Sequence, residues 1–143
     1  AKAVEVAIEL CKEAGARRAV PLKVSGPFHT PLLEEASVNL AKELNNIEFQ
    51  DMKIPVLTNV TAEVIADSSE IKDLLIKQVK SSVKWSETIR NMIDMGIDTF
   101  IEIGPSRTLS GFLRDIDRNV TSFNVEDMKS LNKTLEGIMV RNA

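Results

Sequence analysis

His29 is the only histidine in the chain, and its setting could support proton transfer. It follows a turn-rich segment, residues 25–28, and precedes Thr30-Pro31, a pair that favours the start of a helix. Loops between a strand and a helix lie at the edge of an open α/β sheet where ligands bind. The positive end of the helix dipole disfavours an imidazolium, so we expect a neutral ring that can accept a proton. The alternative is a surface or packed histidine without a chemical role, and the spacing by itself favours that alternative.

Gln78 is a second candidate, because its spacing from Leu74 and Leu75 places it on the apolar face of a predicted helix. Its backbone carbonyl falls in the last turn, where carbonyls lack partners within the helix. Such a carbonyl could accept a hydrogen bond from a histidine ring and so fix its tautomer. The alternative is an amide that reaches solvent at a frayed helix end, and the sequence alone slightly favours it.

Other residues give weaker signals. Gly104-Pro105-Ser106 could present N–H groups to an anion, but it lacks the glycine-rich phosphate fingerprints, so a tight connecting turn is the expected role. Cys11 lies on an apolar helix stripe and is expected in the core. The chain contains no Gly-x-Ser-x-Gly elbow, which would mark a nucleophilic serine.

Composition excludes several classes of protein. The net charge of −3 argues against a general nucleic-acid binder. One cysteine cannot form an internal disulfide, and one histidine with one cysteine makes a zinc site of nitrogen and sulfur ligands improbable. No apolar run reaches the roughly 18–20 residues of a membrane span, so we expect no membrane association. The length of 143 residues suits one domain, and the cytosol is the default compartment.

The elements that must position these residues alternate between helix and strand. Helical spacing and capping signals predict the helices, and short apolar runs predict the strands. The predicted helices cover residues 3–14, 30–44, 67–80, 86–96, 107–116 and 127 onward, and the predicted strands cover residues 19–24, 54–57, 99–103 and 120–125. In the last helix, Leu131, Leu135 and Ile138 should face inward. This order favours an α/β fold with a largely parallel sheet and right-handed crossovers.

The segment Val24-Ser25-Gly26-Pro27-Phe28-His29-Thr30-Pro31-Leu32-Leu33 closely resembles the active-site histidine segment of the malonyl-CoA:acyl carrier protein transacylase family. Further segments resemble the same family in the same order: residues 54–61, 78–87, 100–105 and 109–111. The match runs through almost the whole chain, and the conserved order of its blocks makes it strong evidence.

The resemblance implies a fold with two subdomains, an α/β-hydrolase-like acyltransferase core and a small ferredoxin-like insertion. Residues 1–24 would be the last helix and strand of the small subdomain, and residues 25–143 the C-terminal part of the large one. The chain would then be the C-terminal portion of the enzyme, without the segment that carries the nucleophilic serine. Such a portion should expose apolar patches, and the apolar residues of its first helix and strand should find little to pack on: Val4, Ile8, Leu22 and Val24.

The resemblance also implies the activity, a ping-pong transfer of malonyl from coenzyme A to a serine and then to the phosphopantetheine thiol of acyl carrier protein in fatty acid biosynthesis. His29 would be the general base and later the general acid, and Gln78 would orient its ring through the backbone carbonyl. Phe28 and Asn59 would contact the substrate, with Phe28 favouring malonyl over bulkier units. The implied partners are malonyl-CoA, acyl carrier protein and the missing N-terminal portion, in the cytoplasm, with no metal and no cofactor beyond the thioester substrate.

Two structural predictions follow from the resemblance. A ring nitrogen of His29 should lie about 2.7–3.2 Å from the Gln78 carbonyl oxygen. Ser106 stands where the family often has glycine, so it should be mildly strained if that position requires a positive φ.

Two other functions stay open. The chain could instead be a non-enzymatic α/β module that binds an acyl or anionic ligand at the His29 loop and the Gly104 turn. It could also be a structural or interaction domain, a degenerate acyltransferase.

Overall fold

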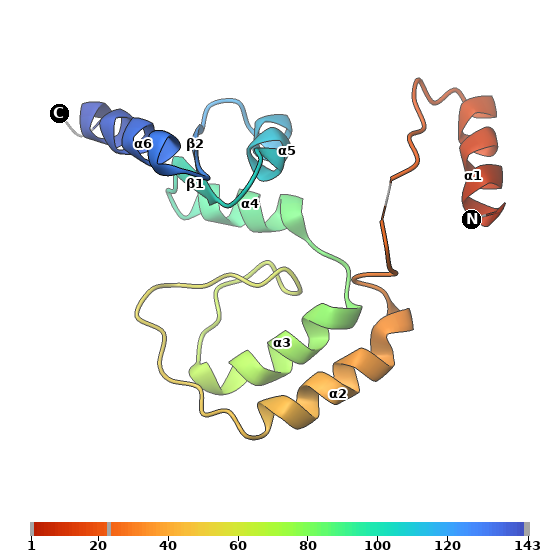
Figure 1. The fold of residues 1–143 in the computed structure, drawn as a ribbon, viewed down its shortest axis with the longest axis horizontal. Coiled ribbons are helices and arrows are strands. Elements are labelled where there is room, and N and C mark those ends of the chain that lie inside the picture. Colours follow the sequence, from red (N-terminus) through yellow and green to blue (C-terminus); the bar gives the residue numbers. More distant parts are fainter. Residues whose placement is uncertain (1, 23, 142–143) are drawn as a thin grey trace.

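The computed structural model describes residues 2–22 and 24–141 (Figure 1). Helices dominate this part of the chain, and the predicted order of helices is confirmed. With η for a 3-10 helix, the elements are α1 (Lys2–Glu13), η1 (Pro31–Leu33), α2 (Glu34–Leu44), η2 (Ser68–Glu70), α3 (Ile71–Lys80), α4 (Trp85–Asp94), β1 (Thr99–Ile103), α5 (Thr108–Ile116), β2 (Thr121–Val125) and α6 (Met128–Arg141).

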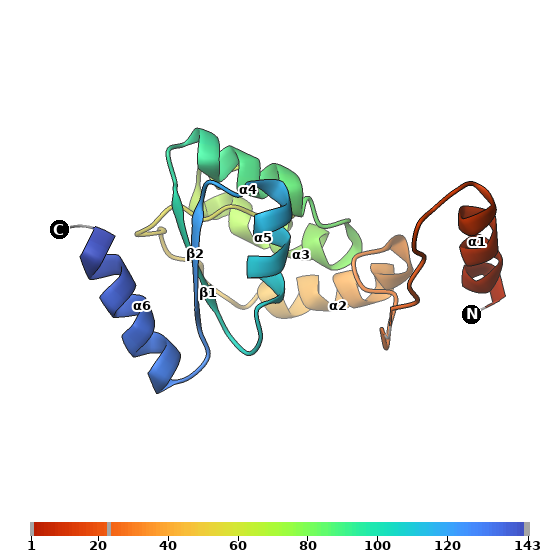
Figure 2. The same cartoon turned by 90° about the horizontal axis from the view of Figure 1, so that it is seen from above.

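The two strands β1 and β2 pair in parallel, with Thr99 opposite Thr121 and Ile103 opposite Val125. Helix α5 connects them, so the unit is a β-α-β crossover, as the alternating pattern predicted. Figure 2 shows α4 and α5 on one side of the strands and α6 on the other. The predicted α/β class and parallel pairing are therefore confirmed for this part of the sheet.

Helix α6 packs on β2 through a glycine. A Cβ at Gly137 would lie 2.5 Å from the Phe123 ring, so the ring occupies the space that a side chain at position 137 would need. One turn earlier, the buried Thr134 donates its hydroxyl to the Asn124 carbonyl oxygen at 3.4 Å. The face of α6 against the strand therefore runs through Thr134 and Gly137, and the predicted inward position of Leu135 is wrong because that side chain is 45% exposed.

Helices α2 and α3 lie side by side in both ribbon views (Figures 1 and 2). Ser37 of α2, only 1% exposed, donates its hydroxyl to the Ile76 carbonyl oxygen of α3 at 3.1 Å. Leu44 of α2 and Leu74 of α3 are also buried. The predicted start of α3 near Asp67 is confirmed, since the Asp67 carboxylate accepts a hydrogen bond from the Ser69 N–H at 2.8 Å.

Two predicted strands are wrong. Residues 19–22, residue 24 and residues 54–57 are irregular, apart from an isolated antiparallel bridge between Leu57 and Val64; Lys23 lies outside the described residues. A strand needs a hydrogen-bonded neighbour, and the described part of the chain places no strand beside either segment. Pro21 and Pro55 also remove one N–H from each segment.

Helix α1 packs against little of the described chain. It has no buried residue, and Figure 1 shows it apart from the other helices at the end of an extended connection. Cys11 is exposed, so its predicted core position is wrong. Val4, Leu22 and Val24 are exposed as well, and Ile8 is half-buried, which confirms the expectation that these residues would find little to pack on.

Candidate active site

The ring of His29 meets the last turn of α3. Its Nδ1 atom lies 2.9 Å from the backbone carbonyl oxygen of Gln78, within the predicted range. A carbonyl oxygen can only accept, so Nδ1 carries the proton of this bond, and in the neutral ring Nε2 has the free lone pair. The geometric prediction is confirmed. The pair is therefore a nitrogen base with a fixed tautomer, whose catalytic role stays a prediction.

The Gln78 carbonyl is available because α3 ends at Lys80. The carbonyls of the last helical turn have no N–H partner further along the helix, and here a side chain distant in sequence takes that place. Residues 29 and 78 come together only because α2 and α3 are packed side by side (Figure 1). The side chain of Gln78 is half-buried on the face that the spacing predicted.

A tight loop holds the backbone of His29. His29 has φ 58°, in the left-handed region. The Thr30 hydroxyl donates to the Pro27 carbonyl oxygen at 2.8 Å. Thr30 therefore does not cap the following helix with its side chain, contrary to the prediction, because its hydroxyl closes the histidine loop instead.

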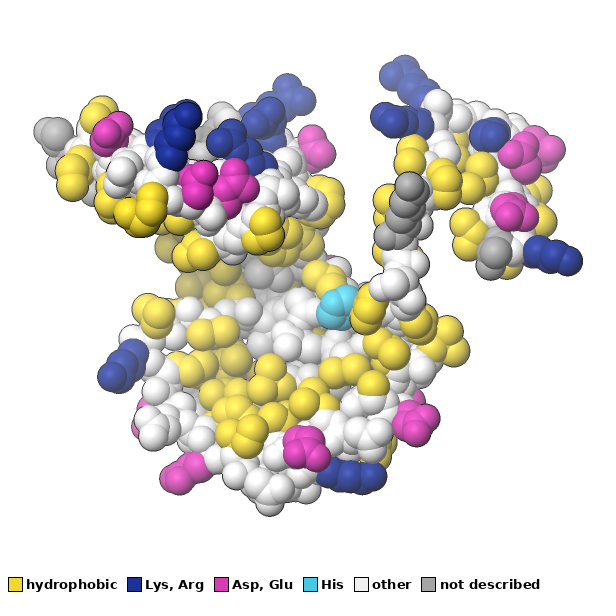
Figure 3. All heavy atoms as spheres, viewed as in Figure 1, with side chains coloured by type: hydrophobic (Ala, Val, Ile, Leu, Met, Phe, Trp, Pro, Cys, Tyr) yellow, Lys and Arg dark blue, Asp and Glu magenta, His cyan; other side chains and the backbone are white. Residues whose placement is uncertain are grey.

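Phe28 and His29 are both exposed. Figure 3 shows the histidine side chain on a face of the molecule where hydrophobic side chains gather. The Phe28 ring folds over Gly26, since a Cβ at Gly26 would lie 3.3 Å from it. The glycine thus leaves room for the ring directly beside the histidine loop. This places Phe28 next to the candidate base, and its contact with a substrate stays a prediction.

Asn59 lies in a separate loop. Its backbone carbonyl accepts from the Lys84 N–H at 2.9 Å, which ties the loop to the start of α4. Its side-chain Oδ1 is buried, and the described residues offer it no hydrogen-bond partner. Within that part of the chain Asn59 makes no hydrogen bond to His29 or Gln78, so the structure does not join it to the pair, and its predicted substrate contact stays a prediction.

The turn after β1 uses its N–H groups internally. Glu102 accepts hydrogen bonds from the N–H groups of Leu109 and Ser110 at 3.0 and 2.8 Å, and from the Ser110 hydroxyl at 2.6 Å. The Ser106 N–H donates to a Glu126 carboxylate oxygen at 3.0 Å. The Ser110 hydroxyl is the main cause that lowers the pKa of Glu102 below its usual value. Within the turn itself, the Gly104 N–H donates to the Val125 carbonyl oxygen at 3.0 Å and the Ser106 N–H is taken by Glu126. The N–H groups of the turn are therefore occupied by the protein, which favours the connecting-turn interpretation over anion binding.

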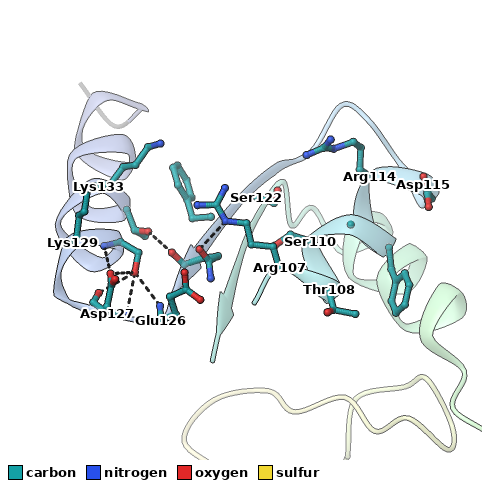
Figure 4. A pocket seen from close by; sticks show the side chains of 16 residues that line it. Arg107, Thr108, Ser110, Arg114, Asp115, Ser122, Glu126, Asp127, Lys129 and Lys133 are labelled. Atoms are coloured by element: carbon teal, nitrogen blue, oxygen red, sulfur yellow. Dashed lines mark hydrogen bonds between the residues drawn. The ribbon is translucent and has the colours of Figure 1, made fainter. Parts of the chain in front are cut away.

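An open groove of about 950 Å³ lies between α5, β2 and α6 (Figure 4). Four cationic side chains border it: Arg107, Arg114, Lys129 and Lys133. Neither His29 nor Gln78 lines it. The sequence analysis did not identify this groove, because three separate elements form it, and the only local signal is the helical spacing of two lysines on α6.

The described residues contain no group of three or more side chains suited to hold a metal ion. In residues 2–22 and 24–141, no helix combines the length and apolar character that a membrane crossing requires.

Comparison with known proteins supports the resemblance drawn from the sequence. No family model matches the chain. The chain is 40% identical over 142 residues, 99% of its length, to the malonyl CoA-acyl carrier protein transacylase of Bacillus subtilis strain 168, of which this covers 45%. A malonyl CoA-acyl carrier protein transacylase crystal structure from Clostridium perfringens matches with a TM-score of 0.90 at 45% identity, over 98% of this chain and 44% of that one.

A third match is a structure of a type II PKS acyl-carrier protein in complex with its malonyl-transacylase, with a TM-score of 0.88 at 38% identity, over 95% of this chain and 44% of that one. The chain therefore spans a little under half the length of the relatives it matches. Its structure corresponds to the C-terminal part of their fold, and the predicted resemblance is confirmed.

Proposed function

We propose that this chain is the histidine-bearing part of a malonyl-CoA:acyl carrier protein transacylase, which moves a malonyl group from coenzyme A to the phosphopantetheine thiol of acyl carrier protein. The observation that carries the proposal is the 2.9 Å contact between His29 Nδ1 and the Gln78 carbonyl oxygen. It lies in a chain that is similar, over nearly all its length, to enzymes of that name.

In the first half-reaction, His29 Nε2 takes the proton of a serine hydroxyl, and the serine oxygen attacks the thioester carbonyl of malonyl-CoA. The tetrahedral intermediate breaks its carbon–sulfur bond, and the imidazolium protonates the departing coenzyme A sulfur. The products are a malonyl-serine ester and free coenzyme A. The serine comes from polypeptide outside these 143 residues, because the chain has no Gly-x-Ser-x-Gly elbow.

In the second half-reaction, His29 takes the proton of the carrier protein's thiol, and the thiolate attacks the malonyl ester. The ester carbon–oxygen bond breaks, and His29 returns the proton to the serine oxygen. Throughout the cycle the Gln78 carbonyl holds the proton on Nδ1 and stabilises the imidazolium. A neutral acceptor therefore does what a carboxylate does in a Ser-His-Asp triad.

The remaining assignments follow from the same proposal. Phe28, exposed beside the histidine loop, and Asn59 contact the substrate. Residues 1–24 belong to a small ferredoxin-like subdomain and residues 25–143 to the large acyltransferase subdomain. The enzyme works in the cytoplasm with malonyl-CoA, acyl carrier protein and the serine-bearing part of the same enzyme, and it uses no cofactor beyond its thioester substrate.

The test is His29→Ala in the intact protein, assayed for malonyl transfer from malonyl-CoA to acyl carrier protein. Loss of the general base should lower kcat by at least about 10²-fold, the usual scale for such a group. Mass spectrometry should also show slower formation of the malonyl-serine ester. Asn46→Ala, an exposed change at the far end of α2, is the control and should keep full activity. An intact enzyme that tolerates His29→Ala would refute the mechanism.

A further inference from the structure

An ion pair lies next to the His29–Gln78 contact. Both carboxylate oxygens of Glu34 lie 2.7 Å from Lys80 Nζ. Glu34 is the first residue of α2, five positions after His29, and Lys80 is the last residue of α3, two positions after Gln78. The pair therefore joins the helix ends that carry the two partners of the candidate site.

A second contact lies one turn further along the same two helices. The Ser37 hydroxyl donates to the Ile76 carbonyl oxygen at 3.1 Å, and Ser37 is fully enclosed. Three contacts thus join the two segments, Ser37–Ile76, His29–Gln78 and Glu34–Lys80, in the order in which their partners occur along α3. The Gln78 carbonyl is therefore flanked along α3 by two residues that contact α2, Ile76 on one side and Lys80 on the other.

Both groups that the ion pair secures are prone to move. The carbonyl groups in the last turn of α3 have no N–H partners further along the helix, so this turn frays unless other contacts hold it. His29 has φ 58°, a conformation that persists only where the surroundings fix it. Glu34 and Lys80 also have the charges that suit their helix ends, an acid at an N-terminus and a base at a C-terminus.

We propose that Glu34 and Lys80 are positioning residues, which fix the last turn of α3 against the start of α2 so that the Gln78 carbonyl stays in line with His29 Nδ1. This inference rests on the proposed function of His29 as the base. Without the ion pair the carbonyl moves away for part of the time, and the proton of the neutral ring can pass from Nδ1 to Nε2. A ring protonated at Nε2 cannot take the proton of a serine.

The side chains of Glu34 and Lys80 are 59% and 32% exposed, so solvent screens the pair and its effect is modest. In the intact protein, Glu34→Gln and Lys80→Met should each lower kcat by about two- to fivefold, the scale of an exposed ion pair. KM for malonyl-CoA should stay unchanged, because neither residue is placed at the substrate. High salt should reduce wild-type kcat towards the variants' value and affect the variants less.

Two neighbours provide matched controls. Glu35→Gln and Lys77→Met remove the same charges from the same two helices, at exposed positions for which the described residues show no ion pair. Both controls should keep wild-type kcat. The charge-exchanged double variant E34K/K80E should recover part of the loss of the single variants, because it restores an ion pair at the same place while its charges no longer suit the helix ends.

Nitrogen NMR of the imidazole gives a readout that a general loss of stability would not move. The His29 signals are assigned by their absence in His29→Ala, and the fraction of neutral ring protonated at Nε2 should rise in Glu34→Gln and Lys80→Met. If Glu34→Gln and Lys80→Met have the same kcat and the same tautomer fraction as the wild type and the two controls, the positioning role is wrong even though His29→Ala is inactive. If His29→Ala is itself fully active, the proposed function fails instead.

Discussion

Among the described residues, three other than glycine have a left-handed backbone: His29 at φ 58°, Ala62 at φ 64° and Ser106 at φ 78°. In this region the Cβ atom crowds the backbone, at a cost of roughly 1–2 kcal/mol per residue. Such conformations persist where neighbouring contacts impose them. For His29 these are the ring contact with Gln78 and the hydroxyl contact of Thr30 with Pro27. The candidate base is thus presented by a backbone that is held under mild strain.

Ser106 gives the cleanest test of this strain. Its positive φ matches the sequence-based expectation that this place of the turn suits glycine. The free energy of unfolding of the Ser106→Gly variant should be about 1 kcal/mol higher than that of the Ser106→Ala variant. Both variants lose the hydroxyl contact with Thr108, but only glycine removes the strain of the positive φ. Chemical denaturation of the intact protein measures the difference. An alanine variant as stable as the glycine variant would show that the turn is not strained.

At the scale of elements, three carboxylates stabilise the starts of three helices. Asp67 precedes η2 and α3, Glu102 binds the first turn of α5, and Asp127 precedes α6. The pKa of each lies below its usual value. For Asp67 and Asp127 the main cause is hydrogen bonding from Ser69 and Ser130, which favours the ionised form. The same chemistry therefore stabilises the starts of α3, α5 and α6.

These lowered pKa values predict how stability depends on pH. A carboxylate with a depressed pKa in the folded state stabilises the protein above its unfolded pKa, about 4, and this contribution is lost as the pH falls through the folded pKa. Glu102→Gln should therefore lower the melting temperature at pH 7, and the gap to wild type should narrow as the pH falls below about 4. The control is Glu136→Gln, an exposed change on α6. A gap that stays constant from pH 7 to pH 3 would contradict the capping role of the ionised Glu102.

At the scale of the whole molecule, apolar surface remains uncovered. Ile103 at the end of β1 is 84% exposed, and Leu22 and Val24 before the histidine loop are 79% and 71% exposed. Strands of parallel sheets are normally covered on both faces. Exposed apolar surface of this kind marks contact sites for other polypeptide. The proposed function supplies such a partner, the serine-bearing part of the same enzyme.

The dependence on that partner can be tested with the 143-residue chain alone. Incubated with malonyl-CoA, it should gain no malonyl ester, because a base without a nucleophile and an oxyanion site cannot form one. Intact-mass spectrometry detects the adduct, and the intact enzyme under the same conditions should acquire it. An ester on Ser25, Ser106 or Ser110 of the isolated chain would show that the nucleophile has been misplaced.

Local patterns in the sequence were enough to predict much of the secondary structure. The helices, β1 and β2 were predictable because apolar spacing, caps and glycine stops act over a few residues. The segments 19–24 and 54–57 have the same apolar character as true strands, but a strand depends on a neighbour that the pattern does not contain. The prediction that Leu135 faces inward failed because it also depends on another element. The Phe123 ring of β2 fills the space above Gly137, so α6 packs on the strand through Gly137 and Leu135 is exposed.

For the candidate site, the sequence by itself determined the participants, the family they resemble and the free carbonyl in the last turn of a helix. Only the tertiary structure decided that the ring of residue 29 and the carbonyl of residue 78 meet at 2.9 Å. The tertiary structure also brings Glu34 and Lys80 together as an ion pair, and it brings the Glu102 carboxylate to the first N–H groups of α5. Contacts between residues this far apart depend on how helices pack, and packing is a property of several faces together that no single segment encodes.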